Sequence, residues 1–483
     1  MADSSLKETT AKGLLWGGFS NALIQILNIG FGICLLRLLT PEDYGTVQVL
    51  AIFSSVAAAL QESGFSAALA NLKHPTHADY NAVFWFNIVC GATLYLLLFL
   101  AAPLIADFYR APVLIPLARF AFLSFLFSSW GIAQRAYLFA HLMVRESSII
   151  FILSLVISGA AAVGMAWMGF AFWGLAAQTV IFTACVTVLN WWYSPWRPTL
   201  EWDFSPVRRM FGFSSRLLLT TLFLQVNRNV FSVLLGRFYG PTPAGLYGNA
   251  AKWNDMGTFT INSMITGVAQ PTLTRVKDDT ARYRHVFRKM LRFTSFVSFP
   301  CMLGLSLVAP EFIRITAGEK WTESIVMLQM LCVYGAFFPL TTLYSNLAIS
   351  RGRSSLNLGN TVATCVLIWT LLYAMRPLGI YAMITAFVCV NVLWLLVWQW
   401  FARRLTGLPF RQALADVLPF FLLAAVTMGV THLITRTLEG DIVRLAAKIA
   451  VAAVFYIGVL YGARAAILRE SIDYFTQKIH RKK

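Results

Sequence analysis

Apolar segments of about 20 residues recur along almost the whole chain, and they limit its possible folds more than any other feature. A helix of that length spans the hydrocarbon core of a bilayer, where no water can hydrogen-bond to an open backbone. The 483 residues are 58% hydrophobic and only 12% charged, whereas roughly a quarter of the residues in soluble domains are charged. The sequence therefore predicts an all-α polytopic membrane protein and excludes the soluble, fibrous and disordered classes.

About fourteen such segments can be distinguished, and each is expected to form one transmembrane helix. The segments at 113–138 and 245–269 are the weakest, because each contains charged residues. The first segment is longer than the apolar region of a secretory signal and no small-residue cleavage site follows it, so we expect it to remain as the first span. The predicted spans are residues 13–37, 46–70, 82–106, 113–138, 147–168, 171–193, 211–236, 245–269, 289–313, 324–349, 355–375, 378–401, 413–434 and 442–463.

Lysine and arginine are distributed unequally over the connections between these segments. Most of the 39 basic residues fall on one side of the predicted membrane, with the heaviest clusters at 275–292 and 464–483. Cytoplasmic connections carry an excess of basic residues, so both termini are predicted to face the cytoplasm. The formal net charge of +18 is then a signal of topology, with some attraction to anionic membrane lipids, and it requires no nucleic-acid partner.

The chain resembles itself when it is shifted by 200 residues. The turns RLLTPEDYG and RFYGPTPAG share a basic residue at the membrane edge, a proline, and a glycine that opens the next helix. A shift of six spans is even, so the two repeats would be parallel, related by an axis along the membrane normal; the alternative is that apolar helices resemble each other by composition alone. The predicted parts are an N-lobe of six spans (1–193), a cytoplasmic linker (194–210), a C-lobe of six spans (211–402), and two C-terminal spans with a basic tail (403–483).

Several blocks of sequence, taken in order, resemble one known family. They read AKGLLWGGFSNALIQ, RLLTPEDYG, ESGFSAAL, VFWFN, APLIADFY, AGLYGNAAKW and GEKW. The chain is similar in these blocks to the oligosaccharide flippases of the multidrug/oligosaccharidyl-lipid/polysaccharide (MOP) exporter superfamily, in its lipopolysaccharide and colanic-acid exporter branch. The resemblance implies two six-helix lobes around a central cavity, plus two further helices.

The same resemblance, and not the composition, supplies a substrate and a location. It implies that the chain moves undecaprenyl-diphosphate-linked oligosaccharide units across the bacterial inner membrane by alternating access, for the synthesis of surface polysaccharide. A polysaccharide polymerase and glycosyltransferases would then be its partners.

Cations inside the predicted spans are candidate substrate-binding residues, because placing an ionisable group in hydrocarbon costs at least about 2.5–3.5 kcal/mol. Arg228 and Lys252 flank the turn between the seventh and eighth spans, each roughly 13 Å from the external surface. At this depth an arginine can bind a diphosphate through two hydrogen bonds, and a lysine acts as a point charge. The alternative is that Asp255 simply neutralises Lys252. Arg119 could face the cavity or extend to the membrane surface.

Polar side chains of the first span form a second group of candidates. Asn21, Gln25 and Asn28 follow an i, i+4, i+7 spacing and so share one helix face, and Gln225 occupies the position of Gln25 in the second repeat. This stripe could offer hydrogen bonds to sugar hydroxyls in a wet cavity. Hydrogen bonds to neighbouring helices are the alternative.

Two carboxylates, Glu62 and Asp255, are candidate ion-coupling residues, since a carboxylate inside a membrane is a usual site for a coupling proton or sodium ion. For Glu62, late in the second predicted span, the alternative is a salt bridge or a helix end near the cytoplasmic interface.

The sequence offers no motif for nucleotide, cofactor or metal chemistry. It contains no GxxxxGK[ST], GxGxxG or HExxH pattern, and its seven cysteines show no paired spacing. An exporter of another amphiphile or drug in the same superfamily is one alternative, although such an exporter would favour acidic groups in the cavity. A membrane polysaccharide polymerase is another, but it would need large external loops, and the external connections here are short. We therefore expect a transporter without a cofactor or metal, and not an enzyme.

Overall fold

The computed structural model describes residues 2–62, 69 and 75–462, and within these ranges it contains helices and turns but no strands. The chain divides into two compact units, Met1–Gly245 and Leu246–Lys483. The all-α prediction is therefore confirmed. Most of the helices begin and end at the turn residues that the hydropathy pattern marks, because an apolar helix stops where the chain reaches polar or turn-forming residues.

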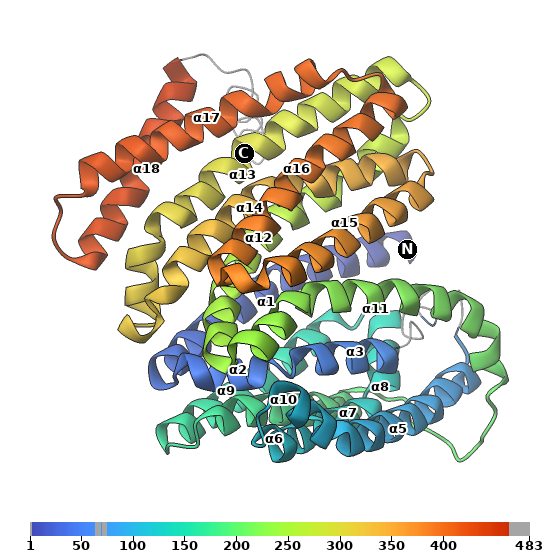
Figure 1. Ribbon diagram of the computed structural model, residues 1–483. Helices are drawn as coiled ribbons and strands as arrows, with labels where there is room; N and C mark the ends of the chain where they lie inside the picture. Colours follow the sequence, from blue (N-terminus) through green and yellow to red (C-terminus); the bar gives the residue numbers. More distant parts are fainter. Residues whose placement is uncertain (1, 63–68, 70–74, 463–483) are drawn as a thin grey trace. The chain divides into compact units, whose positions relative to one another are not determined.

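In the first unit, α9 packs along both α1 and α10, and α5 packs against the short helices α6 and α7 (Figure 1). A polar contact joins the end of α3 to α7, where Gln61 Nε2 donates to the Phe125 carbonyl oxygen at 2.7 Å. The helices of this unit are α1 (Ala2–Leu38), α2 (Pro41–Gln48), α3 (Ala51–Glu62), α5 (His77–Tyr109), α6 (Leu114–Ala121), α7 (Leu123–Ser129), α8 (Ile132–Ala140), α9 (Val144–Trp167), α10 (Phe172–Tyr193) and α11 (Ser205–Tyr239).

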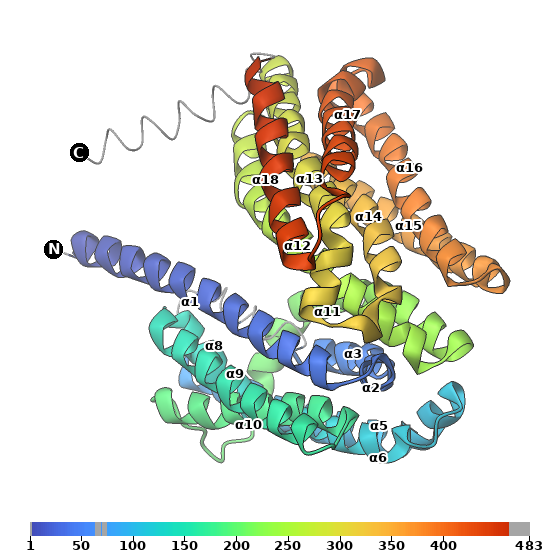
Figure 2. The same ribbon diagram turned by 90° about the vertical axis from the view of Figure 1, so that its left-hand side faces the viewer.

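In the second unit, α13 is the central helix, with α14, α17 and α18 packed along it (Figure 2). Charged contacts hold the last two helices to α13. At one end Asp416 of α17, which is buried, accepts hydrogen bonds from Arg288 and Arg292 at 2.6 Å each. The helices are α12 (Pro241–Arg275), α13 (Thr280–Thr316), η1 (Glu319–Trp321), α14 (Glu323–Ser350), α15 (Ser354–Met375), η2 (Arg376–Leu378), α16 (Ile380–Thr406), α17 (Phe410–Thr435) and α18 (Asp441–Gly462).

A buried ion pair joins α18 to α13. Lys448 Nζ of α18 lies 2.7 and 2.8 Å from the two carboxylate oxygens of Glu311 on α13, and 3.0 Å from the Leu307 carbonyl oxygen. Glu311 is 2% exposed and Lys448 3%. Each charge is thus neutralised and hydrogen-bonded where it is cut off from water, which is the condition for keeping an ion pair in a low-dielectric interior.

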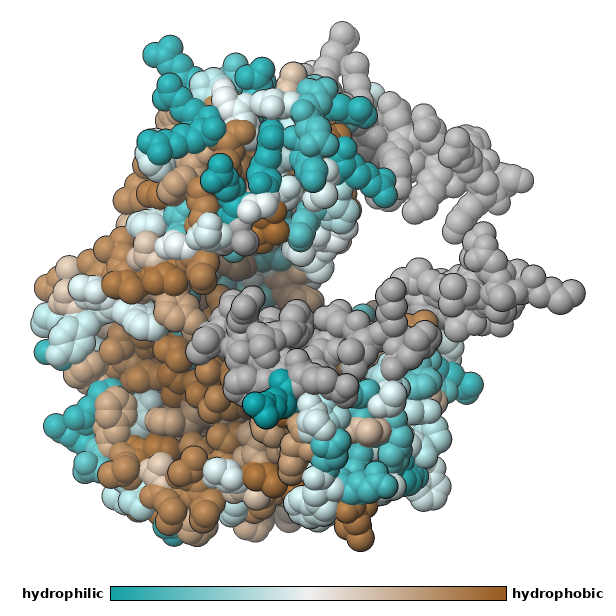
Figure 3. Space-filling model, turned by 90° about the vertical axis from the view of Figure 1, so that its right-hand side faces the viewer, coloured by the Kyte–Doolittle hydropathy of each residue, from teal (hydrophilic) through white to brown (hydrophobic). Residues whose placement is uncertain are grey.

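Eleven helices of the described ranges are long and apolar enough to cross a membrane, and the bent pair Leu114–Ser129 and Ile132–Ala140 brings the number to twelve. This result confirms a polytopic membrane protein. Broad hydrophobic areas on the surface agree with it (Figure 3, brown), as do exposed apolar side chains such as Leu104 on α5.

The remaining two predicted spans, 211–236 and 245–269, fall on α11 and α12, which are 35 residues long but are not among the twelve. Polar side chains interrupt their apolar character, among them Arg228 in α11 and Lys252 in α12. A total of fourteen spans therefore stays a prediction.

The two turns that resemble each other in the sequence pack directly against one another in the first unit. A side-chain Cβ at Gly45 would lie 1.7 Å from the Pro241 carbonyl oxygen, and one at Gly245 would lie 1.9 Å from the Pro41 carbonyl oxygen. Only glycine fits such an approach. The contact is reciprocal, because each glycine meets the proline four residues before the other. The parallel repeat and the two lobes that the sequence suggests stay predictions.

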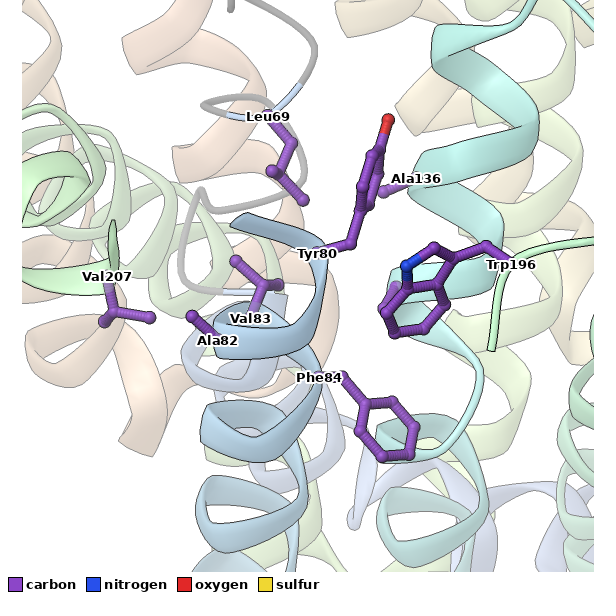
Figure 4. Close-up of a cluster of buried hydrophobic side chains, with 9 residues drawn as sticks. Leu69, Tyr80, Ala82, Val83, Phe84, Ala136, Trp196 and Val207 are labelled. Carbon is purple, nitrogen blue, oxygen red and sulfur yellow. The ribbon is translucent and has the colours of Figure 1, made fainter. Parts of the chain in front are cut away.

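Residues 194–204 form an extended segment that is fixed to the start of α5. Asn81 Nδ2 donates to the Glu201 carbonyl oxygen at 2.8 Å, and Asn81 Oδ1 accepts from the Thr199 amide at 2.9 Å. Trp196, 7% exposed, lies in a cluster of buried apolar side chains with Tyr80 and Phe84 (Figure 4). The first part of the predicted linker is therefore held in place, and α11 begins at Ser205, inside the range predicted for the linker.

Candidate functional site

The middle of α11 is anchored to α2 and α3 by amide and hydroxyl side chains. Asn229 is buried, and its Nδ2 donates to Ser55 Oγ of α3 at 3.3 Å and to the Gln225 carbonyl oxygen at 2.9 Å. One turn further on, Gln48 Nε2 of α2 donates to Ser232 Oγ at 3.3 Å. These contacts fix which face of α11 is turned towards the rest of the first unit.

Arg228 precedes Asn229 and therefore projects from α11 in a direction about 100° away from that anchored face. Its side chain is exposed, and that of Gln225 is half-buried. The helix thus presents a cation near the middle of a segment of membrane-spanning length. An exposed guanidinium on an anchored helix has the accessibility that binding a phosphate requires.

The polar stripe of α1 is exposed along its whole length: Asn21, Gln25 and Asn28 all belong to the exposed class. The packing of α1 against α9 is made by other residues, with Leu35 and Leu39 buried beside Ala162. The stripe is therefore turned away from the apolar contact of this helix, as the spacing predicts. This placement is consistent with a wet surface, and the role of the three residues stays a prediction.

Lys252 lies in α12 of the second unit, and its side chain is half-buried. Its Nζ is 5.7 Å from the ring centroid of Trp253, and that ring is buried edge-on against Phe312 at 4.7 Å. Asp255, the predicted neutralising group, is exposed. Arg228 and Lys252 belong to different units, so the proposed pairing of the two cations stays a prediction.

The packed face of α12 is also polar. Asn249 Nδ2 donates to Ser324 Oγ of α14 at 3.3 Å, and Asn254 is buried opposite Gly335 of the same helix, where a Cβ would lie 2.4 Å from Asn254 Oδ1. The glycine lets α14 approach a buried amide closely. A helix with amides on its packed face and charges elsewhere has the composition of one that borders water inside a membrane.

Arg119 is engaged by its neighbouring helix. Its Nε lies 3.4 Å from the Phe99 carbonyl oxygen of α5, and its guanidinium carbon lies 4.2 Å above the Phe99 ring. Both contacts engage the guanidinium of Arg119, so a substrate would have to compete with them. The placement of Arg119 in the cavity stays a prediction.

Glu62 is the last residue of α3, and its side chain lies outside the described residues. The ion-coupling role predicted for it therefore stays a prediction, as does that of Asp255. Among the described residues no group of three or more histidine, cysteine or acidic side chains could hold a metal ion.

Sequence reasoning missed the pair Glu311 and Lys448, although both lie inside predicted spans. The signal was present, since a carboxylate in 289–313 and an ammonium in 442–463 are two ionisable groups in hydrocarbon. The sequence alone does not show that α13 and α18 pack together, and this packing is what pairs the two residues.

These features define a class: a multi-pass helical membrane protein whose two polar helices carry cations within otherwise apolar surroundings. Comparison with known proteins narrows the class. A model of the family described as "Polysaccharide biosynthesis protein" matches residues 34–326, more than half of the chain. The chain therefore belongs to this family.

Relatives resemble the chain over nearly its full length. The lipopolysaccharide biosynthesis protein WzxC of Escherichia coli (strain K12) is 25% identical, over 91% of this chain and 90% of the relative. The teichuronic acid biosynthesis protein TuaB of Bacillus subtilis (strain 168) is also 25% identical, over 95% of this chain and 96% of the relative. A further relative, the succinoglycan biosynthesis transport protein ExoT of Rhizobium meliloti (strain 1021), is 22% identical over 91% of this chain and 90% of the relative. Among solved structures, the lipid II flippase MurJ in an inward closed conformation has a TM-score of 0.72 at 13% identity, over 93% of this chain and 99% of MurJ. At this identity the likeness shows the fold alone.

Proposed function

We propose that the chain moves undecaprenyl-diphosphate-linked oligosaccharide repeat units across the bacterial inner membrane by alternating access. The family match and the near full-length similarity to proteins named for lipopolysaccharide and teichuronic acid biosynthesis support a glycan-export role. The fold shared with a lipid II flippase supports a cargo that is lipid-linked. The two relatives are named for different polymers, so the repeat unit itself is left open.

The observation that carries the proposal is the placement of Arg228. A diphosphate loses its hydration when it enters a membrane, and a fixed cation compensates for part of that loss. Arg228 is exposed on a helix that Asn229 anchors through Ser55, so the guanidinium is presented on a fixed support. A planar guanidinium can donate two parallel hydrogen bonds to one phosphate.

The polar character of α11 and α12 fits the same function. A helix that borders a water-filled chamber exchanges apolar residues for amides and charges, and its mean hydropathy falls accordingly. We infer that these two helices are the seventh and eighth of fourteen spans, with both termini in the cytoplasm. In this arrangement Lys252 and Gln225 would also contact phosphate or sugar, and the α1 stripe would bind sugar hydroxyls.

Transport would be driven by an ion gradient or by consumption of the product. Glu62 and Asp255 are the proposed coupling groups, and Arg119 is a weaker candidate for substrate contact because Phe99 already engages it. A polysaccharide polymerase and glycosyltransferases would act on the same lipid-linked unit before and after it is moved.

Substitution of Arg228 tests the proposal in cells that depend on this protein for surface polysaccharide. Arg228→Ala should abolish the polysaccharide while leaving the level of the protein in the membrane intact, and Arg228→Lys should restore part of it because the charge remains. Arg208→Ala is the matched control, since it removes an exposed arginine from the same helix outside the predicted span. Normal polysaccharide in the Arg228→Ala strain would remove this residue from the mechanism.

A further inference from the structure

A cavity of about 470 Å³ opens in the second unit, where α15 begins and α16 ends. Arg353 immediately precedes α15, and Ser355 and Leu356 lie in the first turn of that helix; the other side of the cavity is formed by the last two turns of α16. Among the residues whose side chains the structure describes, the lining is Arg353, Ser355, Leu356, Phe401, Arg404 and Leu405. None of the residues assigned above to substrate binding or ion coupling takes part in it.

The polar part of this lining is cationic. Its described side chains supply two guanidinium groups and one hydroxyl, and none of them is acidic. Arg404 is stacked on the ring of Trp400, with 3.7 Å between its guanidinium carbon and the ring centroid, which orients the planar group without neutralising it. No carboxylate lies within 4.0 Å of either lining arginine in the part of the chain that the structure describes.

The neighbouring arginine behaves differently. Arg351 is stacked 4.3 Å above the ring of Tyr283, and its Nη2 lies 3.5 Å from Thr280 Oγ1. This side chain is thus used to join the start of α13 to the end of α14. The contrast indicates that Arg353 and Arg404 are placed for a partner from outside the chain.

The rest of the lining is apolar: Leu356, Phe401 and Leu405. Both helices are of membrane-spanning length and apolar composition, so their shared end lies at the boundary between hydrocarbon and water. Trp400 on α16 is 47% exposed, and tryptophan is enriched at membrane interfaces, which supports this placement of the helix ends. The cavity therefore offers cations beside a hydrophobic surface at the level of the lipid headgroups.

We propose that this cavity binds the phosphate of an anionic membrane phospholipid, such as phosphatidylglycerol. Arg353 and Arg404 donate hydrogen bonds to the phosphate oxygens. Paired guanidinium groups suit phosphate oxygens because each presents a planar set of donors. Ser355 donates a further hydrogen bond, and one acyl chain follows Leu356, Phe401 and Leu405. Basic sites between membrane helices are suited to anionic headgroups in general. The bound lipid is a resident ligand that holds α15 and α16 together, distinct from the transported cargo.

The test compares lipid binding to the purified full chain and to matched variants. Phosphatidylglycerol or phosphatidylcholine is titrated against the detergent-solubilised protein, and bound lipid is counted by native mass spectrometry while the melting temperature is recorded. The unchanged protein should retain phosphatidylglycerol in preference to phosphatidylcholine and melt at a higher temperature with it, since a ligand that binds only the folded state stabilises that state.

The double variant Arg353→Gln/Arg404→Gln should lose this preference. Each substitution removes hydrogen bonds from a charged donor to the phosphate, so the affinity of the double variant for phosphatidylglycerol should fall at least roughly a hundredfold. Arg403→Gln is the control: it removes an exposed arginine from the same end of α16 that does not line the cavity. Its binding should equal that of the unchanged chain. Arg404→Lys keeps the positive charge but loses the planar set of donors, so its loss of affinity for phosphatidylglycerol should be intermediate.

Three results would overturn the proposal. The first is equal retention of phosphatidylglycerol by the double variant and the unchanged chain. The second is an equal loss in the Arg403→Gln control, which would indicate a general effect of surface charge. The third is displacement of the bound lipid by undecaprenyl diphosphate at equal concentration, which would assign the cavity to the cargo. Because the readout is lipid binding, none of these results depends on whether the chain transports an oligosaccharide.

Discussion

Replacing Gly45 by alanine is the sharpest structural perturbation that the fold suggests. The new Cβ would lie 1.7 Å from the Pro241 carbonyl oxygen, whereas real Cβ atoms essentially never come within 3.0 Å of another heavy atom. The obstructing atom belongs to the backbone, so no side-chain rotation relieves the clash. The two turns must therefore move apart by well over one ångström.

The cost follows from the contacts that this movement breaks. Overpacking of a close contact costs about 1–3 kcal/mol, and a gap of about 0.5–1 Å already forfeits a quarter to a half of the dispersion attraction across it. Alanine itself favours a helix over glycine by about 1 kcal/mol. Gly30→Ala in α1 isolates that favourable effect, because nothing lies within 4 Å of its Cβ.

We expect Gly45→Ala to lower the melting temperature by several degrees and Gly30→Ala to leave it unchanged or raise it slightly. The assay is size-exclusion chromatography of the detergent-solubilised protein after heating. Gly245→Ala, whose Cβ would lie 1.9 Å from the Pro41 carbonyl oxygen, should resemble Gly45→Ala. Both changes separate the same two turns, so the double variant should lose less than the sum of the single losses. Equal stability of Gly45→Ala and Gly30→Ala would refute the reasoning.

Two further predictions concern charged residues. Lys448→Ala should destabilise the protein by up to about 3–5 kcal/mol, because the buried Glu311 carboxylate loses its hydrogen-bonded ammonium and keeps Arg444 Nη1, at 3.9 Å, as its remaining cation contact. Lys448→Met combined with Glu311→Leu should restore most of the melting temperature. A double variant no more stable than the single one would contradict this account of the pair. Glu62→Gln should remove the dependence of transport on a pH gradient in proteoliposomes, and an unchanged dependence would exclude Glu62 as the coupling group.

The hydropathy pattern was sufficient to predict the helical class and most of the helices, because a bilayer imposes one length and one composition on any helix that crosses it. It was least informative at α11 and α12. There the residues proposed to bind the substrate, such as Arg228 and Lys252, are also residues that lower the hydropathy. Polar residues of this kind lower the mean hydropathy of a helix, so a membrane-spanning helix that carries them is harder to recognise from its sequence.

Contacts between distant parts of the chain were harder to predict. The repeat of Pro41 and Gly45 at Pro241 and Gly245 was visible in the sequence, but the packing of one turn against the other was not. The attachment of residues 194–204 to Asn81 was equally hidden, because a stretch rich in proline and charge also has the composition of a loose linker. In each case the missing information is which segments are neighbours in space.

The most direct test of the central claim is a flipping assay with the purified chain in proteoliposomes. A lipid-linked oligosaccharide with a diphosphate is placed in the membrane, and its appearance in the opposite leaflet is followed with an impermeant glycosidase. The account predicts that the unchanged chain moves this lipid, that Arg228→Ala does not, and that Arg208→Ala does. Movement at the same rate with Arg228→Ala, or none with the unchanged chain under an imposed ion gradient, would contradict it.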